Sequence, residues 1–340
     1  MAVTVELERL GSVDEARADW EQLATASGNP FATLEWTETW LEHAAGPYVP
    51  HLFLARDPGG RAAAIVPLVI ARGRYVRKAR FLGFRAANQV GPICAPEDAE
   101  LGDEALRRVL AATRRDWDVF LAENLPGTGW DARLGAKAIR TKGAPLVRGP
   151  WKSWDDYLAS RTRNLRSELR RKERRLQEQG LTHTTVRAPD ELEPALDALF
   201  ELHRGRWGSE ASPFFSGLET FHRAFARAAS SRGWVRLLVL ELDGRPVAAN
   251  YSLRFGDAEW SYQLGRDLRL EHASVGLIGC AIAVRGAFAE GATEFRLGPG
   301  EQPYKLRLAN DNSALDTVGI AHGLRGRASL MAARRREGAA

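Results

Sequence analysis

The pattern of apolar and polar positions is clearest between residues 235 and 265. Apolar residues run almost without a break from Val235 to Leu242, which predicts a buried strand. Residues 243–246 (DGRP) supply a tight turn, and residues 247–255 and 259–265 predict two further strands. We expect these three strands to be neighbours in one antiparallel sheet.

The period of the pattern changes after the third strand. Residues 274–279 (SVGLIG) predict a short loop, and residues 280–291 predict an apolar helix. A further strand is predicted at residues 293–298, and the string GPGEQPYK follows at residues 298–305. Three strands, a helix start that contains glycine and one more strand together outline a ligand site.

The two halves of the chain share an order of elements. Each half predicts a strand, two helices and a strand–turn–strand hairpin, at residues 3–10, 13–26, 33–45 and 51–70 in the first half and at residues 182–187, 191–207, 218–231 and 235–255 in the second. This order predicts an α+β fold with a duplicated domain, in which each copy is a mixed, mostly antiparallel sheet flanked by helices. We place the N-terminal domain at residues 1–150 and the C-terminal domain at residues 151–330.

The composition is ordinary for a folded protein, and together with the length it limits the kind of protein that the chain can be. The chain has 340 residues, of which 44% are hydrophobic and 27% are charged, and this length suits two domains. The longest apolar run, residues 62–71, is far shorter than the roughly 20 residues that span a bilayer. No signal-peptide pattern is present, and the two cysteines, Cys94 and Cys280, suit a reducing compartment. We therefore expect a cytoplasmic protein, and the scattered histidines predict no metal site.

Positive charge is concentrated in one predicted helix. The net charge is +5, and residues 161–175 hold eight Arg and Lys residues against only Glu168 and Glu173. A narrow apolar stripe, which consists of Leu165, Leu169 and Leu176, predicts that the basic side faces outward. Such a side is either simply solvated or a surface for an anionic acceptor, a membrane or the backbone of tRNA.

Four segments resemble one known family. They are the basic helix at residues 163–180, HRGRW at 203–207, the hairpin at 242–255 and LGPGEQPYKLRL at 297–308. Together they resemble the GNAT-fold acyltransferases related to Fem-like peptidyltransferases and CelD-like acetyltransferases. The resemblance covers residues 154–321 well and the N-terminal half more loosely, and the PYK string is its most specific part. It implies tandem GNAT-like domains that transfer an acyl or aminoacyl group to an amine.

The sequence also departs from the family pattern. The usual GNAT phosphate loop reads Gln or Arg, two residues, Gly, one residue, and Gly or Ala, whereas Gly276 and Gly279 have another spacing. A valine stands near them where this family commonly places proline, and Arg296 stands where relatives have aspartate. The donor that the resemblance implies is acetyl-CoA or another acyl-CoA, with aminoacyl-tRNA as the alternative.

The resemblance implies a donor site on the second half. Backbone amides at a helix start attract phosphate groups, and the residues concerned are Ser274, Val275, Gly276, Leu277, Ile278 and Gly279. Main-chain atoms of Gln263 and Leu264, on the third strand described above, are expected to bind the pantetheine amide and polarise the thioester carbonyl. The alternative is that Ser274 only caps the helix and the glycines only relieve packing.

Three residues near the last predicted strand are candidate catalytic groups. Tyr304 is expected to protonate the leaving thiolate, as GNAT enzymes often place a tyrosine there. Lys305 would stabilise developing negative charge or hold a phosphate, and Glu301 would serve as the base for the attacking ammonium. The alternatives are a surface Tyr–Lys pair that caps a helix and an exposed loop glutamate.

The resulting hypothesis is an N-acyltransferase that moves an acyl group, acetyl first, from acyl-CoA to an amine by direct attack. Two alternatives stay open. The first is Fem-like transfer from aminoacyl-tRNA, which the short length of the basic helix disfavours. The second is a non-catalytic GNAT pair that binds an anionic polymer. The expected acceptor is an amine-bearing small molecule or a cell-envelope or polysaccharide precursor, and tRNA is a further partner to test.

Overall fold

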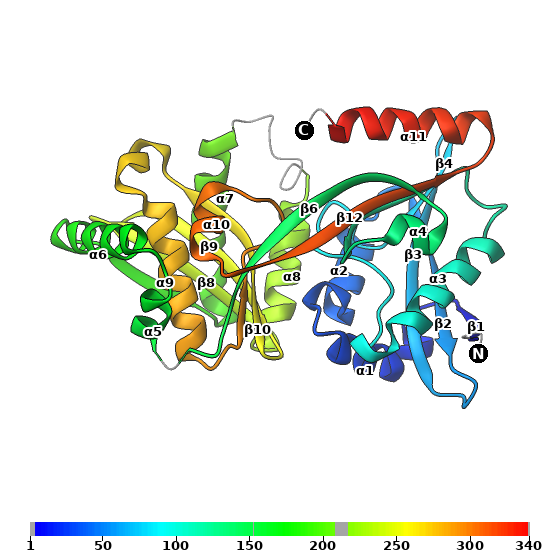
Figure 1. Cartoon of the computed structure of the whole chain (residues 1–340), viewed down its shortest axis with the longest axis horizontal. Helices are drawn as coiled ribbons and strands as arrows, with labels where there is room; N and C mark the ends of the chain where they lie inside the picture. The colour runs from blue at the N-terminus through cyan, green and yellow to red at the C-terminus, as the bar shows by residue number, and fades with distance from the viewer. Residues whose placement is uncertain (1–3, 152, 208–216, 339–340) are drawn as a thin grey trace. The chain divides into compact units, whose positions relative to one another are not determined.

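The computed structural model describes residues 4–151, 153–207 and 217–338 (Figure 1). By its internal contacts the chain forms two compact units, Met1–Gly143 with Ser313–Ala340, and Ala144–Asn312. The boundaries fall inside two long strands, β6 (Lys137–Arg148) and β12 (Asp311–Ala321). The predicted domains had their boundaries at residues 150 and 330, so the last residues of the predicted second domain belong to the first unit.

The first unit has the strand order β1-β2-β3-β4-β5-β12. All of these pairs but one are antiparallel, and β4 and β5 are parallel. Its other elements, in chain order, are β1 (Glu6–Leu10), η1 (Asp14–Ala16), α1 (Arg17–Ser27), η2 (Pro30–Ala32), α2 (Leu34–His43), β2 (Tyr48–Arg56), β3 (Ala62–Arg72), β4 (Arg77–Phe81), η3 (Pro96–Asp98), α3 (Ala99–Ala112), β5 (Val119–Pro126), α4 (Trp130–Leu134) and α11 (Gly323–Gly338).

The core of the first unit forms around β3. Ten consecutive residues of this strand, Ala62–Ala71, are buried, as the long apolar run predicts for a central strand covered on both faces. The helices α1 and α3 both contact β3. Three tryptophans, Trp20 of α1 and Trp36 and Trp40 of α2, are fully buried and supply much of the packed area.

The second unit has the strand order β6-β11-β10-β9-β8-β7. Its other elements, in chain order, are α5 (Trp154–Ala159), α6 (Arg163–Glu178), β7 (Thr182–Val186), η4 (Pro189–Glu191), α7 (Leu192–Trp207), α8 (Glu219–Ser231), β8 (Val235–Leu242), β9 (Arg245–Phe255), β10 (Ala258–Arg266), η5 (Leu268–Ala273), α9 (Val275–Ala289), β11 (Glu294–Arg296) and α10 (Pro303–Leu308). The pairs β8–β9 and β9–β10 are antiparallel, which confirms the three predicted neighbouring strands.

Helices cover both faces of this second sheet. Gly279 of α9 lies over Ala248, whereas α7 lies over Gly265, which pairs with Ala249. Because successive residues of a strand point to opposite faces, α9 and α7 cover opposite faces of the sheet. The apolar stripe of α6 packs beside α9 in one core cluster, as Figure 1 shows for the two helices. In the described parts of the chain, no helix is long and apolar enough to cross a membrane.

Candidate functional site

Strand β10 separates from its parallel neighbour after a short contact. Only residues 258–260 of β10 pair with residues 294–296 of β11. The register with β9 shifts between Ser261 and Gln263, which marks a bulge at this point of the strand. Gln263 and Leu264 pair with β9, and within the described residues no strand pairs with their other edge. An extended ligand could add to that edge as a further strand.

Helix α9 begins at the residue after Ser274. The predicted loop at residues 274–279 is therefore wrong from Val275 onward. The physical reason lies in Ser274, whose left-handed backbone (φ 57°, ψ 39°) turns the chain directly from η5 into the helix. Because Ile278 N already donates to Ser274 O at 3.0 Å, the amides ahead of it are those of Val275, Gly276 and Leu277. The side chain of Ser274 makes no capping hydrogen bond.

Gly276 lies against the end of β10. A Cβ atom at this position would be 2.8 Å from Cδ of Arg266 and 3.6 Å from Cδ2 of Leu264. Any larger residue would therefore displace the Arg266 side chain. The absence of a side chain brings the helix start close to the unpaired part of β10.

Two cations that the sequence analysis missed lie beside this helix start. Nζ of Lys172, on α6, hydrogen-bonds Oγ of Ser274 and lies 3.5 Å from the carbonyl oxygen of His272. Arg266 forms an ion pair with Glu271 at 3.0 Å. Each cation also has a carboxylate partner, Lys172 with Glu168 at 3.2 Å and Arg266 with Glu271, so the first-turn amides supply the positive character of this helix start. No local motif marks Lys172, because its place beside Ser274 depends on the packing of α6.

The string GPGEQPYK forms a tight loop that Lys305 closes. Lys305 is buried, and its Nζ donates to the carbonyl oxygens of Gly298 (3.2 Å) and Pro299 (2.8 Å). Gly298 (φ 77°) and Gly300 (φ 93°) adopt backbone conformations that favour glycine. These contacts hold the loop that leads from β11 to α10.

The other two candidate catalytic residues have different surroundings. Tyr304 lies in the first turn of α10 and packs, partly buried, against the core cluster that Leu264 also contacts. Glu301 is exposed, and its Oε1 accepts a hydrogen bond from Nδ2 of Asn312 at 2.8 Å. The catalytic roles of Tyr304, Lys305 and Glu301 stay predictions.

Burial raises the pKa of several groups in this unit, and Cys280 and Glu259 are the two that bear on the site. It raises the pKa of the Cys280 thiol to about 12, against the opposing influence of the Lys305 charge. The thiol is therefore neutral near pH 7 and unsuited to act as a nucleophile. Burial likewise raises the pKa of Glu259, on β10, to about 7, although the charges of Arg236 and Arg254 oppose the rise.

The first unit repeats the strand arrangement with opposite charge at the helix start. Residues 78–80 of β4 pair in parallel with residues 119–121 of β5. The helix that follows β4, however, begins at Asp98, with Glu97 and Glu100 beside it. Asp98 forms an ion pair with Arg61 at 2.7 Å. The start of α3 therefore has negative charge where α9 has positive neighbours, and it is unsuited to bind phosphate.

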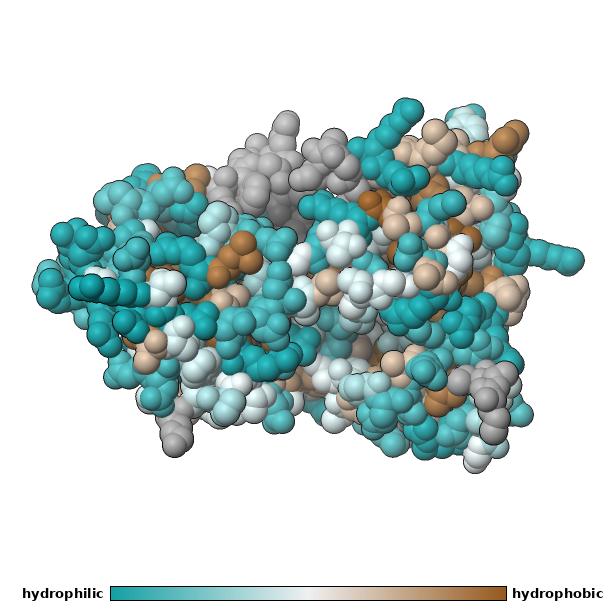
Figure 2. Space-filling view, viewed as in Figure 1, coloured by the Kyte–Doolittle hydropathy of each residue, from teal (hydrophilic) through white to brown (hydrophobic). Residues whose placement is uncertain are grey.

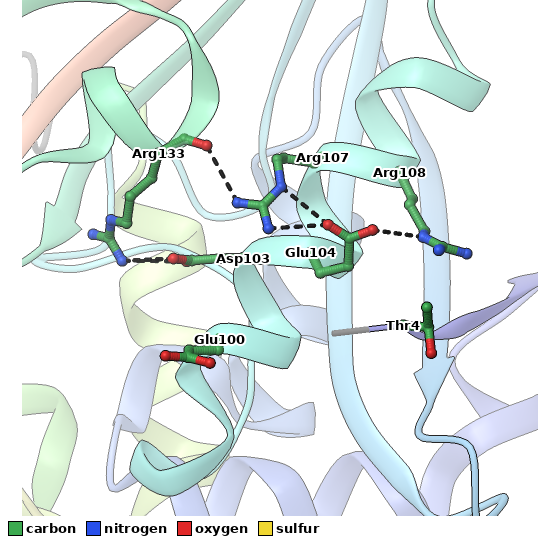
Figure 3. Close-up of a pocket in the computed structure, with 7 residues that line it drawn as sticks. All are labelled: Thr4, Glu100, Asp103, Glu104, Arg107, Arg108 and Arg133. Carbon is green, nitrogen blue, oxygen red and sulfur yellow. Dashed lines mark hydrogen bonds and ion pairs between the residues drawn. The ribbon is translucent and has the colours of Figure 1, made fainter. Parts of the chain in front are cut away.

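A hollow of about 530 Å³ lies on the first unit, and its charged groups are largely paired with one another. Figure 3 shows Arg133 directed at Asp103, and both Arg107 and Arg108 directed at Glu104. The separations are 2.9 Å for Arg133–Asp103, 2.9 Å for Arg107–Glu104 and 2.7 Å for Arg108–Glu104. Because these charges pair with one another, the network stabilises the first unit and gives no reason to place a ligand in the hollow.

Comparisons with known proteins show a family match within the second unit. Residues 163–306 match the family described as an acetyltransferase (GNAT) domain. No curated protein matches the chain.

Similar solved structures include the crystal structure of FemX, with 10% identity, a TM-score of 0.65 and coverage of 96% of this chain and 100% of that one. Another is the C-terminal domain (DUF2156) of a lysylphosphatidylglycerol synthetase from Agrobacterium fabrum, with 12% identity, a TM-score of 0.59 and coverage of 94% and 95%. A third is a tandem GNAT protein from the clavulanic acid biosynthesis pathway, with 12% identity, a TM-score of 0.56 and coverage of 94% and 99%. The predicted resemblance and the α+β, tandem GNAT-like fold are confirmed.

Proposed function

We propose that the chain is an N-acyltransferase that moves an acyl group, in the first instance acetyl, from acyl-CoA to an amine, because residues 163–306 match the acetyltransferase (GNAT) domain family. The second unit binds the donor and performs the transfer. The acceptor class is an amine-bearing small molecule or a cell-envelope or polysaccharide precursor, and the compartment is the cytoplasm.

The donor lies along the unpaired edge of β10 in this proposal. Its pantetheine arm takes the place of a strand beside Gln263 and Leu264, whose main-chain groups bind the amide and polarise the thioester carbonyl. The pyrophosphate lies at the start of α9 against the amides of residues 275–277. Lys172 adds a charge-assisted contact from α6. The predicted contacts of Ile278 and Gly279 are not used, because the Ile278 amide is already bonded within the helix.

The acyl group passes directly to the acceptor. The amine nitrogen attacks the thioester carbonyl, the new C–N bond forms, and the C–S bond breaks. Tyr304 gives a proton to the leaving thiolate, and Glu301 takes the proton that the amine loses. The neutral Cys280 thiol supports transfer without a covalent enzyme intermediate. Lys305 acts by holding the loop at residues 298–300 beside the end of β11.

One observation carries the proposal: the start of α9, with Gly276 and Lys172, lies beside the edge of β10 that no described strand covers. Phosphate and pantetheine contacts of one donor would thus come from adjacent elements. The duplicated first unit lacks the positive helix start, which restricts the donor to the second unit.

Release of free CoA thiol tests the proposal. We expect acetyl-CoA to release thiol faster when amines from a panel of amino sugars, polyamines and amino acids are added. Release that no amine accelerates, together with transfer from aminoacyl-tRNA to the same amines, would contradict the CoA donor and favour the alternative donor.

A further inference from the structure

The outward side of α6 forms a strip of arginines. A hollow of about 510 Å³ is lined entirely by residues of this helix: Arg163, Arg166, Ser167, Arg170, Arg171 and Arg174. We call these six residues the α6 strip. Figure 2 shows a hydrophilic surface on the left of the view, where Figure 1 places α6.

The positive charge of the α6 strip is only weakly neutralised. Arg170 pairs with Asp155 at 3.1 Å, and Arg174 pairs with Glu178 at 3.6 Å, in both cases between exposed side chains. Arg163 and Arg171 form no ion pair with any described residue. Exposed pairs contribute little free energy, so a stronger anionic partner can replace them.

Contacts on both flanks hold α6 against its unit and leave the α6 strip on the outward side. On one flank Glu168 pairs with Arg307 of α10, and Lys172 bonds the start of α9. On the other flank Glu173 pairs with Arg285 of α9 at 2.9 Å. The arginines of the α6 strip therefore lie together on one outward side of the helix, where an extended array of phosphate groups can reach them.

The composition of the α6 strip narrows the partner further. The strip has no aromatic residue on which bases of a single strand could stack. It also has no large apolar residue that could enter a bilayer. Its chemistry is that of guanidinium groups alone, which bind phosphate oxygens. We propose that the α6 strip binds the anionic phospholipid headgroups of a membrane surface, an interaction that goes beyond the proposed transfer reaction.

Binding to vesicles tests this inference in the full-length protein. Each basic residue near an anionic membrane changes partitioning about fivefold. We therefore expect the triple variant Arg163→Gln, Arg171→Gln and Arg174→Gln to bind mixed phosphatidylglycerol–phosphatidylcholine vesicles at least tenfold more weakly. Binding of the wild-type protein should also fall with salt and be absent with phosphatidylcholine alone.

A second triple variant separates the α6 strip from net charge. Arg327, Arg334 and Arg335 are exposed residues of α11, and their replacement by Gln removes the same three charges. This control should bind vesicles like the wild-type protein, and both variants should keep the wild-type affinity for acetyl-CoA, a separate test of the proposed function. Equal losses in the two variants would overturn the inference. So would tighter binding of a short duplex RNA than of the anionic vesicles.

Discussion

Glu259 is a carboxyl group whose acidity its buried environment changes. Its carboxyl is buried on β10, and burial raises its pKa from 4.5 to about 7. The folded state thus keeps this proton between pH 4.5 and 7, whereas the unfolded chain releases it. The stabilisation from this group is therefore complete below pH 4.5 and is lost as the pH rises through 7. The loss is about 3 kcal/mol, because one pKa unit corresponds to roughly 1.4 kcal/mol.

Replacement of Glu259 by Gln should remove this part of the pH dependence. We expect the free energy of unfolding of the variant, relative to the wild-type protein, to increase between pH 5 and 8, as measured by urea unfolding. The exposed Glu6→Gln variant should follow the wild-type curve. Parallel curves for Glu259→Gln and the wild-type protein would show that the carboxyl ionises normally.

In the proposed mechanism, Tyr304 protonates the leaving thiolate. Tyr304→Phe should lower turnover about 100-fold, the lower range for loss of a general acid, without changing the affinity for acetyl-CoA. Thiol release and calorimetry measure the two quantities. The control is Tyr75→Phe, since Tyr75 is 64% exposed on the first unit. Unchanged turnover in Tyr304→Phe would remove this residue from the mechanism.

At the scale of elements, α6 is connected to the proposed phosphate site through Lys172. Loss of its charge should weaken acetyl-CoA binding about fivefold, since one charge-assisted hydrogen bond contributes roughly 1 kcal/mol beyond a neutral one. Calorimetry of Lys172→Gln measures this effect. Arg175→Gln is the matched control, because it removes one exposed charge from the same helix. An equal change in both variants would assign the effect to the general field of α6.

The sequence predicts the helices and strands better than it predicts where they begin and how they contact one another. Alternation and turn residues predicted β8, β9 and β10, because local patterns specify a strand and its hairpin partner. The start of α9 was predicted too late, since two glycines suggested a loop where the structure has a helix. Helix propensity disfavours glycine, but at Gly276 a Cβ atom would lie only 2.8 Å from Cδ of Arg266 at the end of β10.

Other misses have a tertiary cause. The sequence analysis did not predict β12 or α11, and the return of β12 to the first unit depends on long-range pairing with β5. Lys172 was read only as one member of a basic helix. Its role beside Ser274 depends on how α6 packs against α9, which no local pattern encodes.

At the scale of the whole molecule, the two units share an element order but differ in charge at one helix start. Asp98 directly precedes α3, which has Glu100 in its first turn, whereas Ser274 directly precedes α9, which has no acidic residue in its first turn. An acidic helix start repels phosphate, so we expect one donor molecule to bind per chain. A calorimetric stoichiometry of one would agree with this difference, and a stoichiometry of two would show that the first unit also binds the donor.

The most direct test of the central claim is calorimetric titration of acetyl-CoA into the wild-type protein and the Gly276→Glu variant. A glutamate at the start of α9 is compatible with the helix dipole, but it displaces Arg266 and repels phosphate. Gly286→Glu is the matched control, since Gly286 is exposed on the same helix and has no neighbour near its Cβ position. The account predicts binding to the wild-type protein and the control, and its loss in Gly276→Glu. Equal binding by all three proteins, or binding by none, would contradict a CoA site at the start of α9.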